Sequence, residues 1–148
     1  RLGCEYVGED GQRHTPVLMH RAVTGSWERF YGMLIEHYAG AFPVWLSPVQ
    51  ASIIPITDRN IDYAREVERT LKAAGIRTQL DLGDARMNAK IRDAQLQKIP
   101  YMLVIGDKEQ EAGQVAVRLR NNQNLGPMPV ADFLARVTEK VRTKDKEI

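Results

Sequence analysis

Residues Tyr101–Ile105 read "YMLVI", an unbroken run of apolar and aromatic side chains. A strand with one solvated face alternates apolar and polar residues, whereas a continuous run is typical of a strand buried on both faces of a parallel sheet. Two more strands are predicted before this run, in "ASIIPI" (51–56) and "IRTQLDL" (76–82), and one after it, in "QVAVRLR" (114–120). These segments indicate a sheet with a buried centre.

Between and after these strands, apolar residues recur at helical spacing. The three predicted helical faces are Ile61, Ala64, Val67, Leu71 and Ala74; Met87, Ile91 and Ala94; and Val130, Phe133, Leu134, Val137 and Val141. The alternation of strands and helices predicts an α/β fold, with a mixed, mostly parallel sheet of about five strands flanked by helices and a final antiparallel strand.

The first part of the chain follows a different pattern. In "CEYVGEDGQRHTPVLMH" (4–20) a Gly-Glu-Asp-Gly turn separates two β-prone runs, and "GSWERFYGMLIEHYAG" (25–40) predicts an amphipathic helix that ends at Gly40. Because a two-stranded ribbon has little stability of its own, we expect this part to be the end of another domain. "AFPVWLSPVQ" (41–50) is predicted to be an extended linker, which places the boundary near Pro43 and divides the chain into residues 1–42 and 43–148.

Composition narrows the classes of function. The 148 residues are 43% apolar and 27% charged, with neither a long apolar run nor a leader pattern, so we expect no membrane span and a cytoplasmic location. The net charge of +2 requires any nucleic-acid contact to be made by a local patch. Cys4 is the single cysteine, which excludes an internal disulfide.

The stretch "HRAVTGSWERF" (20–30) combines cations with a Gly-Ser pair where a helix begins. The positive end of a helix dipole favours Glu28 in the first turn and disfavours Arg29, so Arg29 needs another reason to be there. A salt-bridged junction is one interpretation. The other is a nucleotide site, because a helix N-terminus binds anions and an arginine can grip phosphate or stack on a purine.

This stretch resembles motif 3 of the class II aminoacyl-tRNA synthetases, in the form that the motif takes in the threonyl-tRNA synthetase family. The segments "GAFPVWLSPVQ", "AGIRTQLDL", "NAKIRDAQLQKIPYMLVIGDKE" and "GQVAVRLR" follow in the order and at the spacing of the C-terminal part of that family. The resemblance therefore covers essentially the whole chain. It implies that residues 1–42 are a remnant hairpin and helix of the antiparallel catalytic domain, and that residues 43–148 are the anticodon-binding domain.

The resemblance also implies roles in the first part. Arg29 is similar to the catalytic arginine that packs against the adenine and phosphates of ATP, with Gly25 and Ser26 lining the adenylate pocket. His20 is similar to the zinc ligand that comes last along the chain in this family, where the zinc ion binds the amino and hydroxyl groups of threonine. The family's other zinc ligands, and its motifs 1 and 2, are expected upstream of this chain. We therefore expect the chain alone to be inactive and to hold neither zinc nor Mg-ATP stoichiometrically.

In the second part the resemblance assigns Glu109, Arg118, Arg92 and Asp84 to anticodon contacts. Because side chains alternate between the two faces of a strand, Arg118 and Arg120 are predicted on the same face, where their guanidinium groups could donate hydrogen bonds to the edges of bases. Asp84 stands in "GDARMN" where the family commonly has an asparagine, and capping the next helix is its other interpretation. For Lys90 and Arg92, a solvated helix surface and an RNA contact remain equally open.

The function implied is part of a threonine-tRNA ligase, in which this chain binds the anticodon of a threonine tRNA. The parent enzyme would use ATP, threonine, magnesium and zinc, and would form a homodimer through its catalytic domain. A different class of function is a free-standing, non-catalytic RNA-binding accessory or regulatory module with the same fold. A small nucleotide-binding enzyme is disfavoured, because no Gly-rich phosphate loop follows the first strand of the second part.

Overall fold

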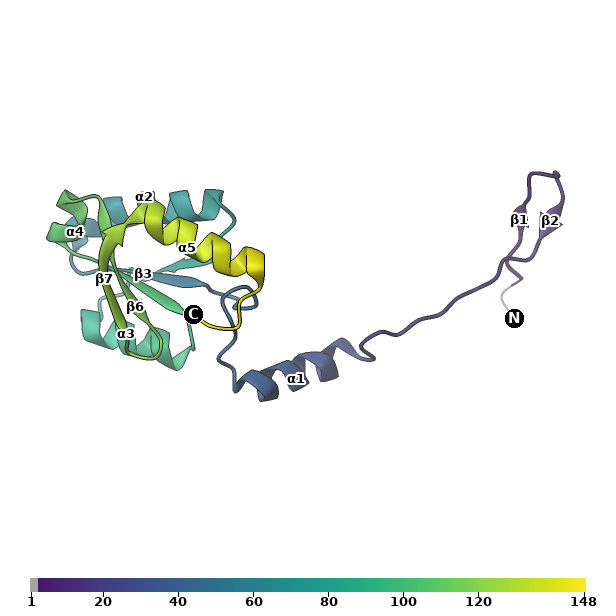
Figure 1. Ribbon diagram of the computed structural model, residues 1–148, viewed down its shortest axis with the longest axis horizontal. Coiled ribbons are helices and arrows are strands. Elements are labelled where there is room, and N and C mark those ends of the chain that lie inside the picture. The colour runs from purple at the N-terminus through teal and green to yellow at the C-terminus, as the bar shows by residue number, and fades with distance from the viewer. Residues whose placement is uncertain (1–2) are drawn as a thin grey trace. The chain divides into compact units, whose positions relative to one another are not determined.

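The computed structural model describes residues 3–148, which divide into two compact units. The first unit ends at Met33 and the second runs from Leu34 to Ile148. Figure 1 follows the chain from one unit into the other, and each is described here by itself.

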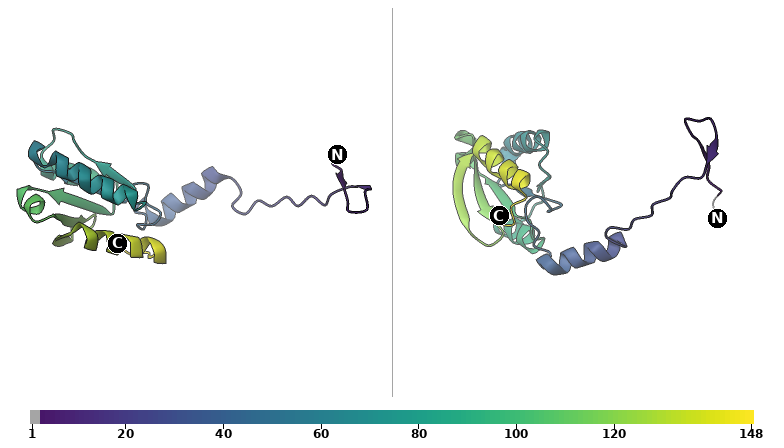
Figure 2. Two further views of the ribbon diagram at one scale, coloured as in Figure 1. Left: turned by 90° about the horizontal axis from the view of Figure 1, so that it is seen from above. Right: turned by 45° about the vertical axis from the view of Figure 1, so that its right-hand side comes forward.

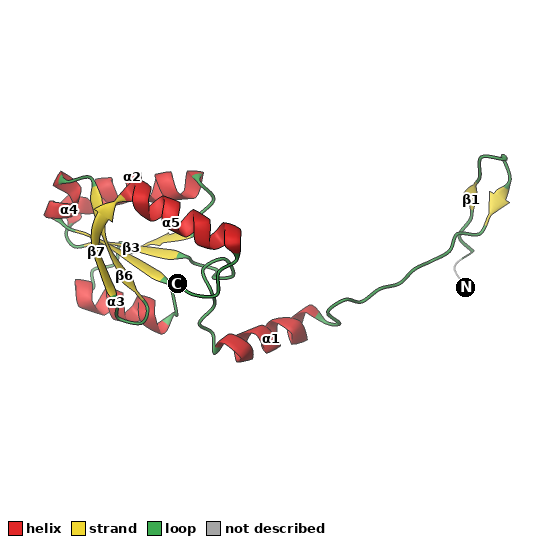
Figure 3. Ribbon diagram, in the orientation of Figure 1, coloured by secondary structure: helices red, strands yellow, loops and turns green. Residues whose placement is uncertain are grey.

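The second unit is built on a five-stranded sheet with the order β4-β3-β5-β6-β7 (Figures 1 and 3). Its strands are β3 (Ala51–Pro55), β4 (Thr78–Leu80), β5 (Tyr101–Ile105), β6 (Gln114–Leu119) and β7 (Asn124–Pro129). Strand β3 pairs in parallel with both β4 and β5, whereas β6 is antiparallel to its neighbours β5 and β7. The predicted α/β class, with a mixed sheet of about five strands, is confirmed.

Helices cover both faces of this sheet (Figures 1 and 2). They are α2 (Ile61–Ala73), α3 (Met87–Leu96), the short α4 (Asp107–Glu111) and α5 (Val130–Thr143), with a 3-10 turn η1 (Asp58–Asn60) before α2. One apolar cluster joins α2 and α5 to one face, and a smaller cluster joins α3 to the other face. The sheet is therefore the middle layer of three.

Burial along the strands follows the sequence pattern. Every residue of β3 and β5 is buried, as the apolar run at Tyr101–Ile105 predicted. In β6, Val115, Val117 and Leu119 are buried under α2 and α5, while the alternate residues are half-exposed on the face that carries α3. Arg118 is therefore positioned on the α3 face.

Strand β7 and helix α4 differ from the prediction. Strand β7 was missed because its sequence, "NLGPMP", contains Gly126, Pro127 and Pro129. Proline cannot donate to a strand ladder, but β7 is the edge of the sheet, where one side of the strand needs no partner. The segment after β5 was predicted to be a turn, and it forms one turn of helix, α4.

The first unit contains the hairpin of β1 (Tyr6–Val7) and β2 (Arg13–His14) and the beginning of α1 (Trp27–Tyr38). The second β-prone run was expected to extend to His20, but strand pairing ends at His14. Within residues 3–148 nothing pairs with the run after His14, so the residues up to α1 have no ladder to join. Helix α1 ends as predicted, with Gly40 at a positive φ of 72°.

The segment between α1 and β3 is not the extended linker that the prolines suggested. Pro43 and Val44 begin a tight turn in which the amides of Leu46 and Ser47 both donate to the Pro43 carbonyl. Val44 is fully buried in the larger apolar cluster, and the Gln50 side chain donates to the Val44 carbonyl. This segment is part of the folded domain.

Candidate nucleic-acid interface

The carboxyl ends of the parallel strands β3, β4 and β5 meet at one edge of the sheet, where the loops that follow them lie together. A pocket of about 270 Å³ opens between the first two of these loops and α3. It is lined by Pro55, Ile56, Thr57, Asp58, Ile61, Leu82, Gly83, Asp84, Ala85 and Lys90. In open parallel sheets this edge is the usual position of a ligand site.

Asp84 lies in the exposed loop before α3 and lines this pocket. It does not cap α3, because the residue at the N-cap position is Arg86 and no side chain makes a cap hydrogen bond there. The helix-cap interpretation of Asp84 is therefore wrong. Its carboxylate is left as an acceptor at the pocket wall.

Lys90 is buried, with 6% of its surface exposed, although it stands in a polar helix. Its Nζ donates to the Asp81 carbonyl at 3.1 Å and lies 3.8 Å from the Asp81 carboxylate. The interpretation of Lys90 as a solvated surface charge is therefore wrong. A buried ammonium needs such partners, because an unpaired charge away from water is costly.

Glu109 is in α4, immediately beyond β5, and is half-exposed. Its Oε2 accepts a hydrogen bond from the Gly106 amide at 3.0 Å, and within residues 3–148 no group bonds to its Oε1. A Cβ on Gly106 would lie 3.0 Å from both Glu109 Oε2 and Ile56 Cδ1. Gly106 was not predicted as part of the site, and it allows the carboxylate to fold back against the strand end.

Arg118 pairs with Met102 of β5 on one side and with Asn124 of β7 on the other, next to a register shift between Val117 and Arg118. Its side chain is half-exposed on the α3 face, and within residues 3–148 it has no hydrogen-bond or ion-pair partner. Such a guanidinium keeps its donors for a ligand.

Arg92 is exposed on α3. It lies on the side of that helix from which Gln95 donates to Asn122 at 2.7 Å, in the turn between β6 and β7. Residues three apart share a helix face, so Arg92 is directed toward the β6 side of α3 rather than toward β4. The structure thus places Arg92 and Arg118 on the same face of the sheet.

Glu109 and Arg118 are not brought into contact. Arg118 is opposite Met102, near the amino end of β5, whereas Glu109 follows the carboxyl end of that strand. At about 3.3 Å per residue, this places them roughly 10 Å or more apart along the strand direction. They would contact different parts of an extended ligand.

Arg120 was expected to share a face and a role with Arg118, and this is wrong. It lies just beyond the end of β6, where its guanidinium donates to the carbonyls of Phe42 and Ala41 and, at 3.3 Å, of Lys98. Burial lowers the pKa of Arg120, and the Tyr101 hydroxyl group acts in the opposite direction. Its donors are used within the fold.

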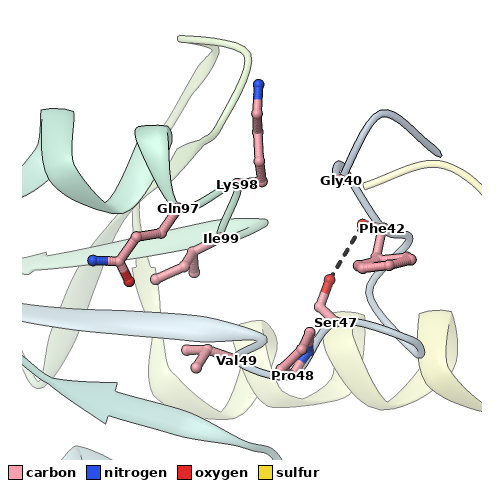
Figure 4. A pocket seen from close by; sticks show the side chains of 8 residues that line it. All are labelled: Gly40, Phe42, Ser47, Pro48, Val49, Gln97, Lys98 and Ile99. Atoms are coloured by element: carbon pink, nitrogen blue, oxygen red, sulfur yellow. Dashed lines mark hydrogen bonds between the residues drawn. The ribbon is translucent and has the colours of Figure 1, made fainter. Parts of the chain in front are cut away.

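A second pocket, of about 250 Å³, lies beside this contact (Figure 4). It is lined by Gly40, Phe42, Ser47, Pro48, Val49, Gln97, Lys98 and Ile99. Figure 4 shows the Ser47 hydroxyl bonded to the Phe42 carbonyl across its rim. None of the predicted site residues lines this pocket.

In the first unit, Ser26 caps α1, because its Oγ accepts the Arg29 amide at 3.2 Å and donates to Glu28 at 2.8 Å. The backbone amide of Glu28 and the Ser26 hydroxyl lower the pKa of the Glu28 carboxyl. Gly25 has a positive φ of 68°, and the side chains of Arg29 and His20 are exposed. Within residues 3–148 there is no group of three or more His, Cys, Asp or Glu arranged to hold a metal ion.

No helix in residues 3–148 combines the length and the apolar character needed to cross a bilayer. Of the polar groups described above, Asp84 and Glu109 lie at the carboxyl edge of the sheet, and Arg118 and Arg92 lie on its α3 side. The sequence of residues 50–140 matches the family model described as the anticodon binding domain. The chain belongs to this anticodon binding domain family.

Similar proteins carry a more specific name. The chain is 54% identical over 148 residues to a threonine–tRNA ligase of Acidobacterium capsulatum, and 52% identical over 147 residues to that of Thermus thermophilus. These alignments cover 100% and 99% of this chain but 22% of each relative, so the chain spans about a fifth of the length of the curated relatives it matches. The resemblance to threonyl-tRNA synthetases is confirmed.

A solved structure supports the same fold. The RNA binding domain of threonyl-tRNA synthetase from Cryptosporidium parvum Iowa II superimposes with a TM-score of 0.74 and 34% identity, covering 91% of this chain and 34% of that chain. The likeness thus extends from the sequence to the arrangement of the strands and helices.

Proposed function

We propose that this chain binds the anticodon loop of a threonine tRNA as the anticodon-reading part of a threonine–tRNA ligase. The observation that carries the proposal is the Arg118 guanidinium, which is half-exposed on the α3 face with no protein partner within residues 3–148. Membership of the anticodon binding domain family and the names of the relatives support the same assignment.

Each polar group contributes a different kind of contact. Arg118 presents a planar fork that can donate two hydrogen bonds to one base, and Glu109 offers a free carboxylate oxygen that can accept from a base amino or imino group. Asp84 offers a second acceptor at the pocket wall. Arg92, exposed on the same side of α3 as Gln95, supplies charge to the phosphate backbone.

We propose that the parent enzyme attaches threonine to its tRNA with Mg-ATP, in the cytoplasm and as a homodimer. In that enzyme Arg29 would contact the adenine and phosphates of ATP, with Gly25 and Ser26 at the adenylate. The start of α1 is the positive end of its helix dipole, which favours a negative charge such as a phosphate group nearby. The chemistry of ATP activation needs residues beyond the ones in this chain.

Zinc does not fit the residues present. His20 would be one of its ligands, but it is exposed and no other ligand group is clustered with it within residues 3–148. A zinc site requires several ligands held in a prepared geometry. No step of the proposed function of this chain depends on zinc.

The proposal is tested by titrating the chain against two RNA stem-loops of equal length, one with a threonine-type anticodon loop and one with the loop bases scrambled. We expect tighter binding to the threonine-type loop by about tenfold or more, because base contacts add to the phosphate contacts that both RNAs share. Equal affinity for the two loops would contradict anticodon reading.

A further inference from the structure

Asn60 is buried, with 1% of its surface exposed, at the carboxyl edge of the sheet. Its side-chain oxygen accepts from the Thr57 amide at 3.3 Å and from the Thr57 hydroxyl at 2.8 Å. Its side-chain nitrogen donates to Asp107 Oδ1 and to Gln110 Oε1, both at 3.0 Å. All four hydrogen-bonding positions of this amide are therefore used.

These partners fix the orientation of the amide. A backbone N–H can only donate, so the Thr57 amide requires the Asn60 oxygen, and an ionised carboxylate can only accept, so Asp107 requires the Asn60 nitrogen. Asn60 thereby joins two loops from different strands, because Thr57 follows β3 whereas Asp107 and Gln110 belong to α4, which follows β5. Arg59 reinforces the junction with an ion pair to Asp107 Oδ2 at 3.0 Å.

The element held in this way is the one that carries Glu109. Helix α4 has only five residues, too few to be stable by itself, so its position depends on outside contacts. Asp107 and Gln110 are three residues apart and face Asn60, while the Glu109 carboxylate is bonded to the Gly106 amide. Holding the side of α4 that carries Asp107 and Gln110 therefore fixes the start of the Glu109 side chain.

We propose that Asn60 is a positioning residue for base reading: its amide locks α4 to the loop after β3 and so holds Glu109 where it can accept a hydrogen bond from one anticodon base. This inference rests on the proposed function, because it takes Glu109 to contact a base. Asn60 itself is covered by protein and does not touch the RNA.

Asn60→Asp is the sharpest probe, because it keeps the size and the two Thr57 contacts but places a carboxylate against Asp107. The double variant Asn60→Asp/Asp107→Asn restores a donor–acceptor pair, since the amide introduced at position 107 can donate to the carboxylate introduced at position 60. Gln79→Glu, at an exposed position of β4, makes the same chemical change away from α4 and controls for added negative charge.

Affinity is measured for stem-loops in which each anticodon position is replaced in turn, so that discrimination is obtained position by position. Glu109→Gln first identifies the position that Glu109 reads. We expect Asn60→Asp to lower discrimination about tenfold at that same position and to leave the others unchanged, with recovery in the double variant. Gln79→Glu should weaken all loops equally.

Hydrogen exchange at the amides of Gln110 and Ala112, which bond within α4, reports whether the helix has opened even if Asn60→Asp lowers overall stability. Faster exchange confined to α4 together with lost discrimination supports the inference. Unchanged discrimination, or an equal loss at every position, would overturn it. If Glu109→Gln alters no position, the role of Glu109 in the proposed function fails instead.

Discussion

Arg120 donates through one guanidinium nitrogen to the carbonyl of Phe42 at 2.6 Å, across 78 positions of sequence. A second nitrogen donates to Ala41 at 2.9 Å, so the side chain bridges the end of β6 and the segment that leads into the domain. Arg77 makes a similar connection, to the carbonyls of Trp45 and Ser47. Residues 41–47 are therefore held by two arginine side chains that flank strands, Arg77 just before β4 and Arg120 just after β6, although these residues form no strand themselves.

Arg118 and Arg120 form a matched pair for separating stability from binding. Arg120→Ala should lower the free energy of unfolding by about 1–3 kcal/mol, because it leaves the backbone carbonyls of Ala41, Phe42 and Lys98 without their charged donor. Arg118→Ala should change it by less than about 0.5 kcal/mol, since that side chain has no partner to lose within residues 3–148. Chemical denaturation of both variants makes the measurement, and equal losses would refute the distinction.

A second matched pair is Lys90 and Arg92 on α3. Lys90→Ala should destabilise the domain by about 1–3 kcal/mol, because it removes a buried side chain and its bond to Asp81. Arg92→Ala, at an exposed position, should have an effect within about 0.5 kcal/mol. Thermal and urea unfolding compare the two variants. A stable Lys90→Ala protein would show that the buried ammonium contributes no net stability.

Arg92 is expected to act on RNA through charge alone. Arg92→Ala should weaken threonine-type and scrambled loops by the same factor and reduce the slope of log affinity against log salt by about 0.7–1, because a phosphate contact releases counterions without reading a base. Titrations at several salt concentrations measure the slope. A loss confined to the threonine-type loop would make Arg92 a base-reading residue.

The place at which the chain can be shortened follows from the Arg120 contact. A chain that begins at Ala41 keeps the Ala41 and Phe42 carbonyls that Arg120 binds and should unfold as cooperatively as residues 1–148. A chain that begins at Val49 loses those carbonyls, the partners of Arg77 and the buried Val44, and should be less stable by about 3 kcal/mol or more. Calorimetry compares the two, and equal stability would show that residues 41–48 are only a tether.

The sequence predicted the parts of the fold that depend on local pattern. The apolar run at Tyr101–Ile105 and the alternation around Val117 are periodic, so they indicated a buried central strand and a half-buried neighbour. Strand β7 was missed because Pro127 and Pro129 contradict strand propensity, and only its place at the sheet edge permits them.

The site was less predictable, because burial and partners are set by the tertiary structure. Arg118 and Arg120 are two residues apart, so strand alternation predicts the same face for both. Only the structure shows that Arg120 lies beyond the end of β6 and donates to the carbonyl of Phe42. Lys90 in a polar helix gives no sign that it will be covered. Asn60 lies in "TDRN", which is typical of a loop, and its partners are 47 and 50 positions away. The one local indication in the sequence is that Asn60 follows Thr57 by three residues, a separation at which two polar side chains can bond across a turn.

The most direct test of base reading is Arg118→Lys, titrated with the threonine-type and scrambled stem-loops. This substitution keeps the positive charge and removes the planar fork, so it separates base reading from attraction to phosphate. We predict that affinity for the threonine-type loop falls by about one to two powers of ten while affinity for the scrambled loop is nearly unchanged. If Arg118→Lys binds the threonine-type loop as tightly as the parent chain does, Arg118 is only part of a basic surface, and the account of anticodon reading is contradicted.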